Sequence, residues 1–197
     1  MKAVVVANIN AGHQAAWGSA FAEGLRRHGW NAEIESAPAP CDLLVMWGVR
    51  NQTGIAEQKS RGGEICILER GYLGDRFAWT SVSFGGGLNG RGVFRGQFDD
   101  GSRWEKYFAS LMQPWQQRDG GYALIMGQVP NDMSLHGLRP QRLWEDASVA
   151  LSDLGLEVYF RGHPLAESVR VPGAKPSKGD LQAALHGAAL VLTINSN

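Results

Sequence analysis

Short apolar runs recur along this chain and alternate with stretches whose apolar residues have helical spacing. The first run, residues 2–9, is a continuous Val and Ala segment, which is typical of a strand buried on both faces of a parallel sheet. After it, Trp17, Phe21 and Leu25 recur at helical spacing and predict a helix that Gly29 ends. Further elements are predicted in the order strand 30–35, strand 42–48, helix 52–61 and strand 65–68. This β-α-β-β-α-β order predicts a mostly parallel sheet.

The second half of the chain repeats the pattern on a smaller scale. Residues 77–98 are rich in glycine and predict a loop with short strands, and residues 104–115 predict an amphipathic helix. A linker is predicted at 116–121, QQRDGG. The elements expected after it are strand 122–126, helix 140–154, strand 157–160, helix 180–187 and strand 190–194. The expected fold is therefore α/β, with two Rossmann-like lobes of mostly parallel strands in domains 1–116 and 121–197.

The last predicted strand runs directly into Asn195, Ser196 and Asn197. In a sheet of this class such a strand leads into a helix and then into further strands. Roughly 75 residues with three strands make less than a usual domain of this type. We therefore expect the second lobe to be incomplete, as if a longer chain had been truncated at its C-terminal end.

Charge and composition narrow the class of partners. The 19 basic and 19 acidic residues cancel, whereas a protein that holds nucleic acid by its phosphates usually has a basic footprint. No apolar run reaches the roughly 18 residues of a membrane span, and the N-terminal stretch lacks the pattern of a signal peptide. A cytoplasmic protein without a membrane span is expected, and Cys41 and Cys66 are expected to be buried free thiols.

Two predicted strands change abruptly from apolar to polar where they end. Strand 157–160 is followed by Arg161, Gly162, His163 and Pro164, and the last strand is followed by Asn195 and Ser196. Ligands of open α/β sheets bind beyond the carboxyl ends of the strands. One helix-sized segment separates the two strands, as a crossover between neighbouring parallel strands requires. We therefore expect His163 and Ser196 to lie side by side. The alternative is that His163 caps its loop and Ser196 caps a helix.

Four segments of the second half resemble, in order and spacing, the capsule-polysaccharide family of Kdo-transferase-like proteins. They are GQVPNDMS at 127–134, RGHP at 161–164, DLQAALHGA at 180–188 and VLTINS at 191–196. Residues 67–92 also resemble a segment of phage and prophage homologues. The resemblance implies a GT-B glycosyltransferase that moves a sugar from a CMP- or UDP-linked donor to a glycan or other hydroxyl acceptor. It also implies a nucleotide site formed by Gln128, Arg161, His163, Asn195 and Ser196.

Glycosyl transfer also needs a base for the proton of the acceptor hydroxyl, or a carboxylate that stabilises the reacting carbon. Glu69 follows a predicted strand and is the best-placed acid, with Asp75 next; the alternative for Glu69 is an ion pair with Arg70 or Arg76. The sequence contains no DxD motif and no Cys or His pairs at metal-ligand spacing, and its first strand-to-helix turn is NINAGH and not the dinucleotide fingerprint GxGxxG. We therefore expect a metal-independent reaction with no cofactor besides the nucleotide sugar. His13 has no partner pattern and is expected at the surface.

Three alternatives to sugar transfer onto a glycan remain open. A phage enzyme that glycosylates modified DNA bases fits the segment 67–92, but the neutral charge favours a glycan acceptor. A nucleotide-sugar epimerase shares the architecture and needs several acids around the sugar, which the sequence does not place. A truncated remnant that binds nucleotide without turnover is the non-enzymatic alternative.

Overall fold

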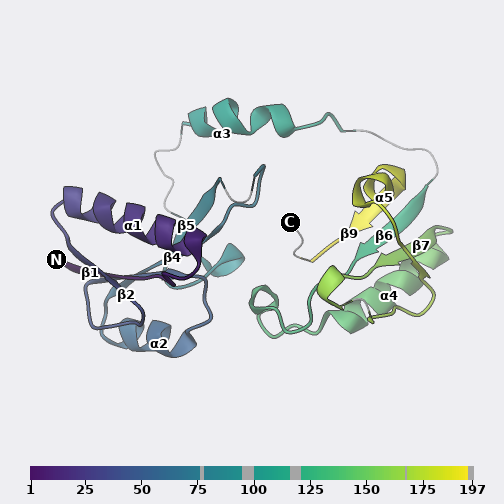
Figure 1. Cartoon of the computed structure of the whole chain (residues 1–197). Helices are drawn as coiled ribbons and strands as arrows, with labels where there is room; N and C mark the ends of the chain where they lie inside the picture. Colours follow the sequence, from purple (N-terminus) through teal and green to yellow (C-terminus); the bar gives the residue numbers. More distant parts are fainter. Residues whose placement is uncertain (76–77, 95–99, 116–120, 167, 195–197) are drawn as a thin grey trace. The chain divides into compact units, whose positions relative to one another are not determined.

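A computed structural model describes residues 1–75, 78–94, 100–115, 121–166 and 168–194. The chain divides into two compact units, Met1–Met112 (unit 1) and Gln113–Asn197 (unit 2). Both units are α/β with mostly parallel sheets, which confirms the predicted fold class at this level (Figure 1). None of the helices in the described part of the chain is long and apolar enough to cross a membrane.

Unit 1 contains a five-stranded sheet in the order β2-β1-β3-β4-β5. Its strands are β1 Lys2–Val6, β2 Asn31–Glu35, β3 Leu43–Trp47, β4 Glu64–Arg70 and β5 Thr80–Phe84. The first four are parallel, and β5 runs antiparallel to β4. Helices α1 (Gly12–Arg27) and α2 (Gln52–Ser60) lie on opposite faces of this sheet (Figure 1).

Two apolar cores lie on the two faces of the unit 1 sheet. Side chains of α1 pack on a core of Val5, Val45, Cys66 and Leu68. The α2 residue Ile55 packs on the other face, with Val4, Leu44, Ile65 and Ile67. Because successive side chains of a strand point to opposite faces, the continuous apolar runs fill both cores.

Two predictions for unit 1 are corrected by the structure. Strand β4 extends to Arg70 because β5 pairs with it, so that Glu69 lies opposite Ser81 inside the sheet and not beyond its strand. The helix predicted at 104–115 is short: α3 is Ser102–Tyr107, and a 3-10 turn, Ala109–Leu111, follows. At the break between them Phe108 leaves the helical conformation and its ring packs 4.9 Å from that of Trp79.

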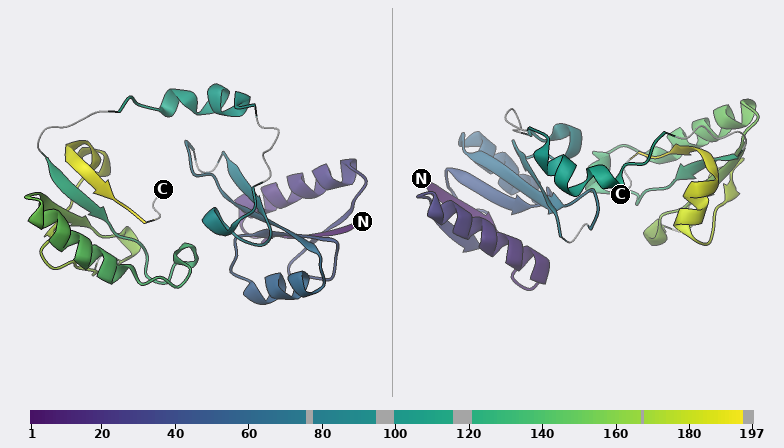
Figure 2. Two further views of the ribbon diagram at one scale, coloured as in Figure 1. Left: turned by 180° about the vertical axis from the view of Figure 1, so that it is seen from behind. Right: turned by 90° about the horizontal axis from the view of Figure 1, so that it is seen from above.

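Unit 2 contains a four-stranded parallel sheet in the order β8-β7-β6-β9. Its strands are β6 Tyr122–Met126, β7 Glu157–Arg161, β8 Lys175–Pro176 and β9 Ala188–Leu192. Helix α4 (Pro140–Asp153) packs on one face through Trp144 and Leu151, and α5 (Leu181–Gly187) packs on the other through Ala184 (Figure 2). The two-residue strand β8 was not predicted.

The strand order corrects the expected pairing of the last two long strands. β7 and β9 are not neighbours, because β6 lies between them and pairs with both. Ala123, Leu124 and Ile125 of β6 are fully buried, whereas Leu190 and Val191 of β9 are about 40% exposed. The more buried strand, β6, therefore lies between β7 and β9, and the ends of those two strands are two strand spacings apart, roughly 9–10 Å.

The buried thiol of Cys66 predicts a loss of stability at alkaline pH. Burial raises the pKa of this thiol from 9.0 to about 12. Between these values the unfolded chain loses a proton that the folded chain keeps, so the free energy of unfolding falls as pH rises. The slope from this group is about 1.4 kcal/mol per pH unit at most. Urea denaturation between pH 8 and 11 should show a shallower decline for Cys66→Ala than for the wild type, and coinciding slopes would contradict the prediction.

Candidate functional site

The loops that follow β6 and β7 are in close backbone contact at the carboxyl edge of the unit 2 sheet, the edge where the parallel strands end. The Gly127 N–H donates a hydrogen bond to the Arg161 carbonyl at 2.8 Å. A Cβ on Gly127 would lie 2.8 Å from the Phe160 ring and 3.2 Å from the Gly162 Cα, so a side chain does not fit there. This contact brings Gln128 and the Arg161–Pro164 loop together.

Arg161 is the last residue of β7 and is mostly buried. Its Nη2 donates to the Gly179 carbonyl at 2.7 Å, which ties the end of β7 to the loop before α5. Its Nη1 is buried and has no hydrogen-bond partner among the residues that the structure describes. A buried guanidinium nitrogen without a partner is costly, because its hydration is lost without replacement.

His163 has one ring nitrogen engaged by its own loop. Nδ1 accepts a hydrogen bond from the Leu165 N–H at 3.1 Å, and the His163 carbonyl accepts one from Ala166 at 2.7 Å. His163 therefore does cap its loop, as the alternative interpretation held. Because a neutral imidazole carries one proton, the acceptor role of Nδ1 leaves Nε2 as an N–H donor. Capping the loop and binding a ligand are therefore compatible.

Of the other residues predicted for this site, Gln128 is among the described residues and two are not. The Gln128 side-chain oxygen accepts a hydrogen bond from the Val129 N–H at 2.9 Å. Asn195 and Ser196 lie outside the described residues. The predicted proximity of His163 and Ser196 therefore stays a prediction. Arg161 ends β7, and Gln128 and His163 follow the adjacent strands β6 and β7.

The unit 1 sheet has a second polar carboxyl edge, which holds Glu69. The Glu69 Oε1 accepts a hydrogen bond from the Arg70 N–H at 2.9 Å, and Oε2 lies 3.6 Å from where a Cβ on Gly48 would be. The carboxylate therefore lies beside the end of β3. Burial, and then the nearby charge of Glu69, raise the pKa of the Tyr72 hydroxyl. Asp75 is exposed, in the loop between β4 and β5.

Three residues at this edge were not predicted as a group. The ring of His13, in the first turn of α1, lies edge-on to Trp47, with centroids 5.3 Å apart. Its Nε2 is 3.5 Å from Nη2 of Arg70. His13 is partly buried, and its contacts with Trp47 and Arg70 were not predicted. The signal that could have found the group is that each residue ends or follows one of three adjacent parallel strands.

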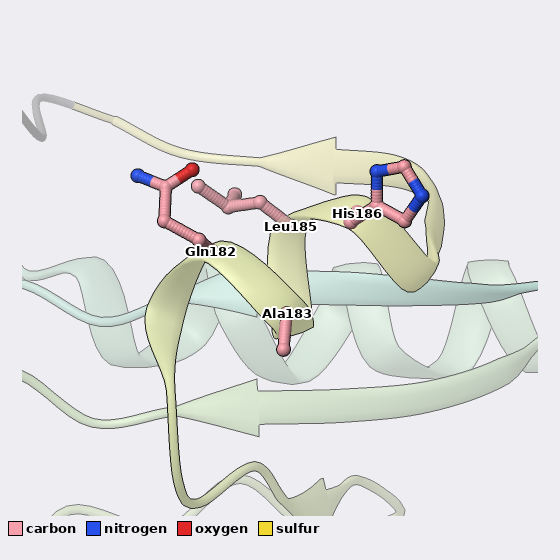
Figure 3. Close-up of a pocket in the computed structure, with 4 residues that line it drawn as sticks. All are labelled: Gln182, Ala183, Leu185 and His186. Atoms are coloured by element: carbon pink, nitrogen blue, oxygen red, sulfur yellow. The ribbon is translucent and has the colours of Figure 1, made fainter.

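A surface pocket on α5 lies apart from the predicted residues. It is lined by Gln182, Ala183, Leu185 and His186 (Figure 3). The side chains of Gln182 and Leu185 lie on one side of the helix and point toward one another. None of the residues predicted for the site lines this pocket, and we assign no function to it. Within the described part of the chain no three His, Cys, Asp or Glu residues gather as metal ligands.

Comparison of the chain with protein-family models and with curated proteins gives no match. The resemblance to the capsule-polysaccharide family therefore rests on the sequence motifs alone, and the functions that it implies are proposals.

The space around Gly127 is filled and that around Gly24 is open, so replacing glycine by alanine should have opposite effects on stability at these two positions. Gly127→Ala places a methyl group against Phe160 and the backbone of β7, and should destabilise the protein by about 1–3 kcal/mol. Gly24→Ala lies in α1 with open space around it and should stabilise by about 0.5–1 kcal/mol. Urea denaturation measures both, and a Gly127→Ala variant as stable as the wild type would contradict the close contact.

Proposed function

We propose that the chain is a GT-B-type glycosyltransferase that takes its sugar from a CMP- or UDP-linked donor, and that the carboxyl edge of unit 2 binds the nucleotide. The observation that carries the proposal is the backbone contact between Gly127 and Arg161, which joins two polar loops at the ends of adjacent parallel strands. Ligands of open α/β sheets bind at such edges.

The donors at this edge suit a phosphate group. Arg161 Nη1, which has no partner among the described residues, and the Nε2–H of His163 are both hydrogen-bond donors without acceptor character in this state. Charge-assisted bonds from a guanidinium to phosphate are among the stronger ones in proteins. Binding a phosphate would satisfy the buried Arg161 nitrogen and offset the cost of its burial.

The same donors would also favour the chemical step. In the transfer, the acceptor oxygen forms a bond to the anomeric carbon while the bond from that carbon to the donor phosphate breaks. The electron pair stays on the phosphate, and Arg161 and His163 would stabilise that growing negative charge without a metal ion. We propose Glu69 as the base that takes the acceptor proton, and Asp75, which is exposed, as the weaker candidate. The balanced charge favours a glycan over DNA as acceptor.

Nucleotide binding should depend on His163. His163→Ala removes the Nε2–H donor, and we expect roughly tenfold weaker binding of CMP or UDP, by isothermal titration calorimetry on the full chain. His186→Ala, on the exposed surface of α5, is the matched control and should bind like the wild type. The nucleotide assignment fails if the wild type binds neither CMP nor UDP, or if both variants behave alike.

Turnover should depend on the carboxylate of Glu69, and donor binding should not. Glu69→Gln keeps the size of the side chain and removes the base, so the transfer rate should fall roughly 10²–10⁴-fold with an unchanged Kd for the donor. Glu64→Gln, at the opposite end of β4, is the control. Unchanged turnover in Glu69→Gln would remove this residue as the base.

A further inference from the structure

The carboxyl edge of unit 1 includes a basic group on the opposite face of the sheet from Glu69. Arg70 shares the face of Cys66 and Leu68, which α1 covers, because side chains alternate along β4. Glu69 shares the other face, with Ile65 and Ile67. Arg70 therefore meets His13 at the start of α1, and the carboxylate belongs to the α2 side.

This group lies where open α/β sheets bind ligands. The chain passes from β1 to β2 on one side and then to β3 on the other side of β1. The ends of β1 and β3 therefore flank a topological switch point, where a crevice forms beyond the strands. His13 follows β1, and Trp47 ends β3. Their ring contact lies at this switch point.

The chemistry of the group points to a negatively charged ligand. Arg70 Nη2 lies 3.5 Å from His13 Nε2, a long hydrogen-bond distance, so a guanidinium and an imidazole from different elements converge at this edge. An oxyanion placed against both accepts hydrogen bonds from each. The start of α1 adds to this: its N-cap is Ala11, which provides no side-chain cap, and its first turn has no acidic residue. The first amides of this 16-residue helix and the positive end of its dipole favour an anion at the same edge.

We propose that His13 and Arg70 form an oxyanion-binding site on the α1 side of the unit 1 edge, and that it holds a phosphate or carboxylate group of the acceptor. The assignment of this oxyanion to the acceptor rests on the proposed glycosyl transfer, whereas the anion site itself does not. The acceptor would then be an acidic or phosphorylated sugar compound and not a neutral glycan.

The test follows the imidazole nitrogens of His13 by NMR in the ¹⁵N-labelled full chain. The probes are inorganic phosphate, glucose 6-phosphate, glucuronate and, as the neutral control, glucose, at constant ionic strength. We expect a saturable shift of the His13 signals with phosphate-bearing probes, carboxylate-bearing probes or both, and none with glucose. A response to one kind alone identifies which oxyanion the site takes.

Two variants locate the response. Arg70→Gln should weaken the binding of the responding probe roughly tenfold or more. Arg27→Gln is the control, because it removes the same charge from the last turn of α1. Equal weakening by both variants, no response to any anion, or an equal response to glucose would each overturn the proposal. If Arg70→Gln does not fold, the four wild-type titrations decide alone.

The same samples separate this proposal from the proposed function. CMP and UDP are titrated in parallel and followed at the backbone amides of Gly127 and Gly162. A His13 response without nucleotide binding would leave the anion site in place and remove the glycosyltransferase proposal. Nucleotide binding without a His13 response would leave the glycosyltransferase proposal in place and remove the anion site.

Discussion

The parallel pairing of strands is the constraint on which both candidate edges depend. In a parallel sheet all strands end at the same edge, so that residues far apart in the sequence come together there. The backbone contact between Gly127 and Arg161 is the closest instance, because it leaves no room for a side chain between two strand ends. It fixes Gln128 beside the Arg161–Pro164 loop. Arg161 Nη1, which is buried and has no hydrogen-bond partner in the described part of the chain, lies at the same place.

The two units apply this constraint with different chemistry. The carboxyl edge of unit 2 holds hydrogen-bond donors on β7, with His163 oriented by its own loop. At the carboxyl edge of unit 1 the consecutive residues Glu69 and Arg70 place a carboxylate on one face of β4 and a guanidinium on the other. Such a division suits a donor site in one unit and an acceptor site with its own base in the other, which is the arrangement that the proposed transfer requires.

Much of the fold could be predicted because the strongest signals are local. The buried strands β1, β3 and β6 are continuous apolar runs, and α4 begins at Pro140 and ends before Gly155, where helix signals are expected. The strand order of unit 2 could not be predicted in the same way, because it depends on which strand gains most from having both faces covered. His13 was missed because its partner Arg70 is 57 residues away. Glu69 was placed beyond its strand because the pairing of β4 with β5 is a tertiary contact that residues 65–70 do not encode.

A crystal structure of the full chain with bound CMP or UDP tests the central claim most directly, since it shows where the nucleotide phosphate lies. The account predicts a phosphate oxygen within hydrogen-bond distance of Arg161 Nη1 and of His163 Nε2. A nucleotide bound away from the ends of β6 and β7, for example with its phosphate at His13 and Arg70, would contradict it.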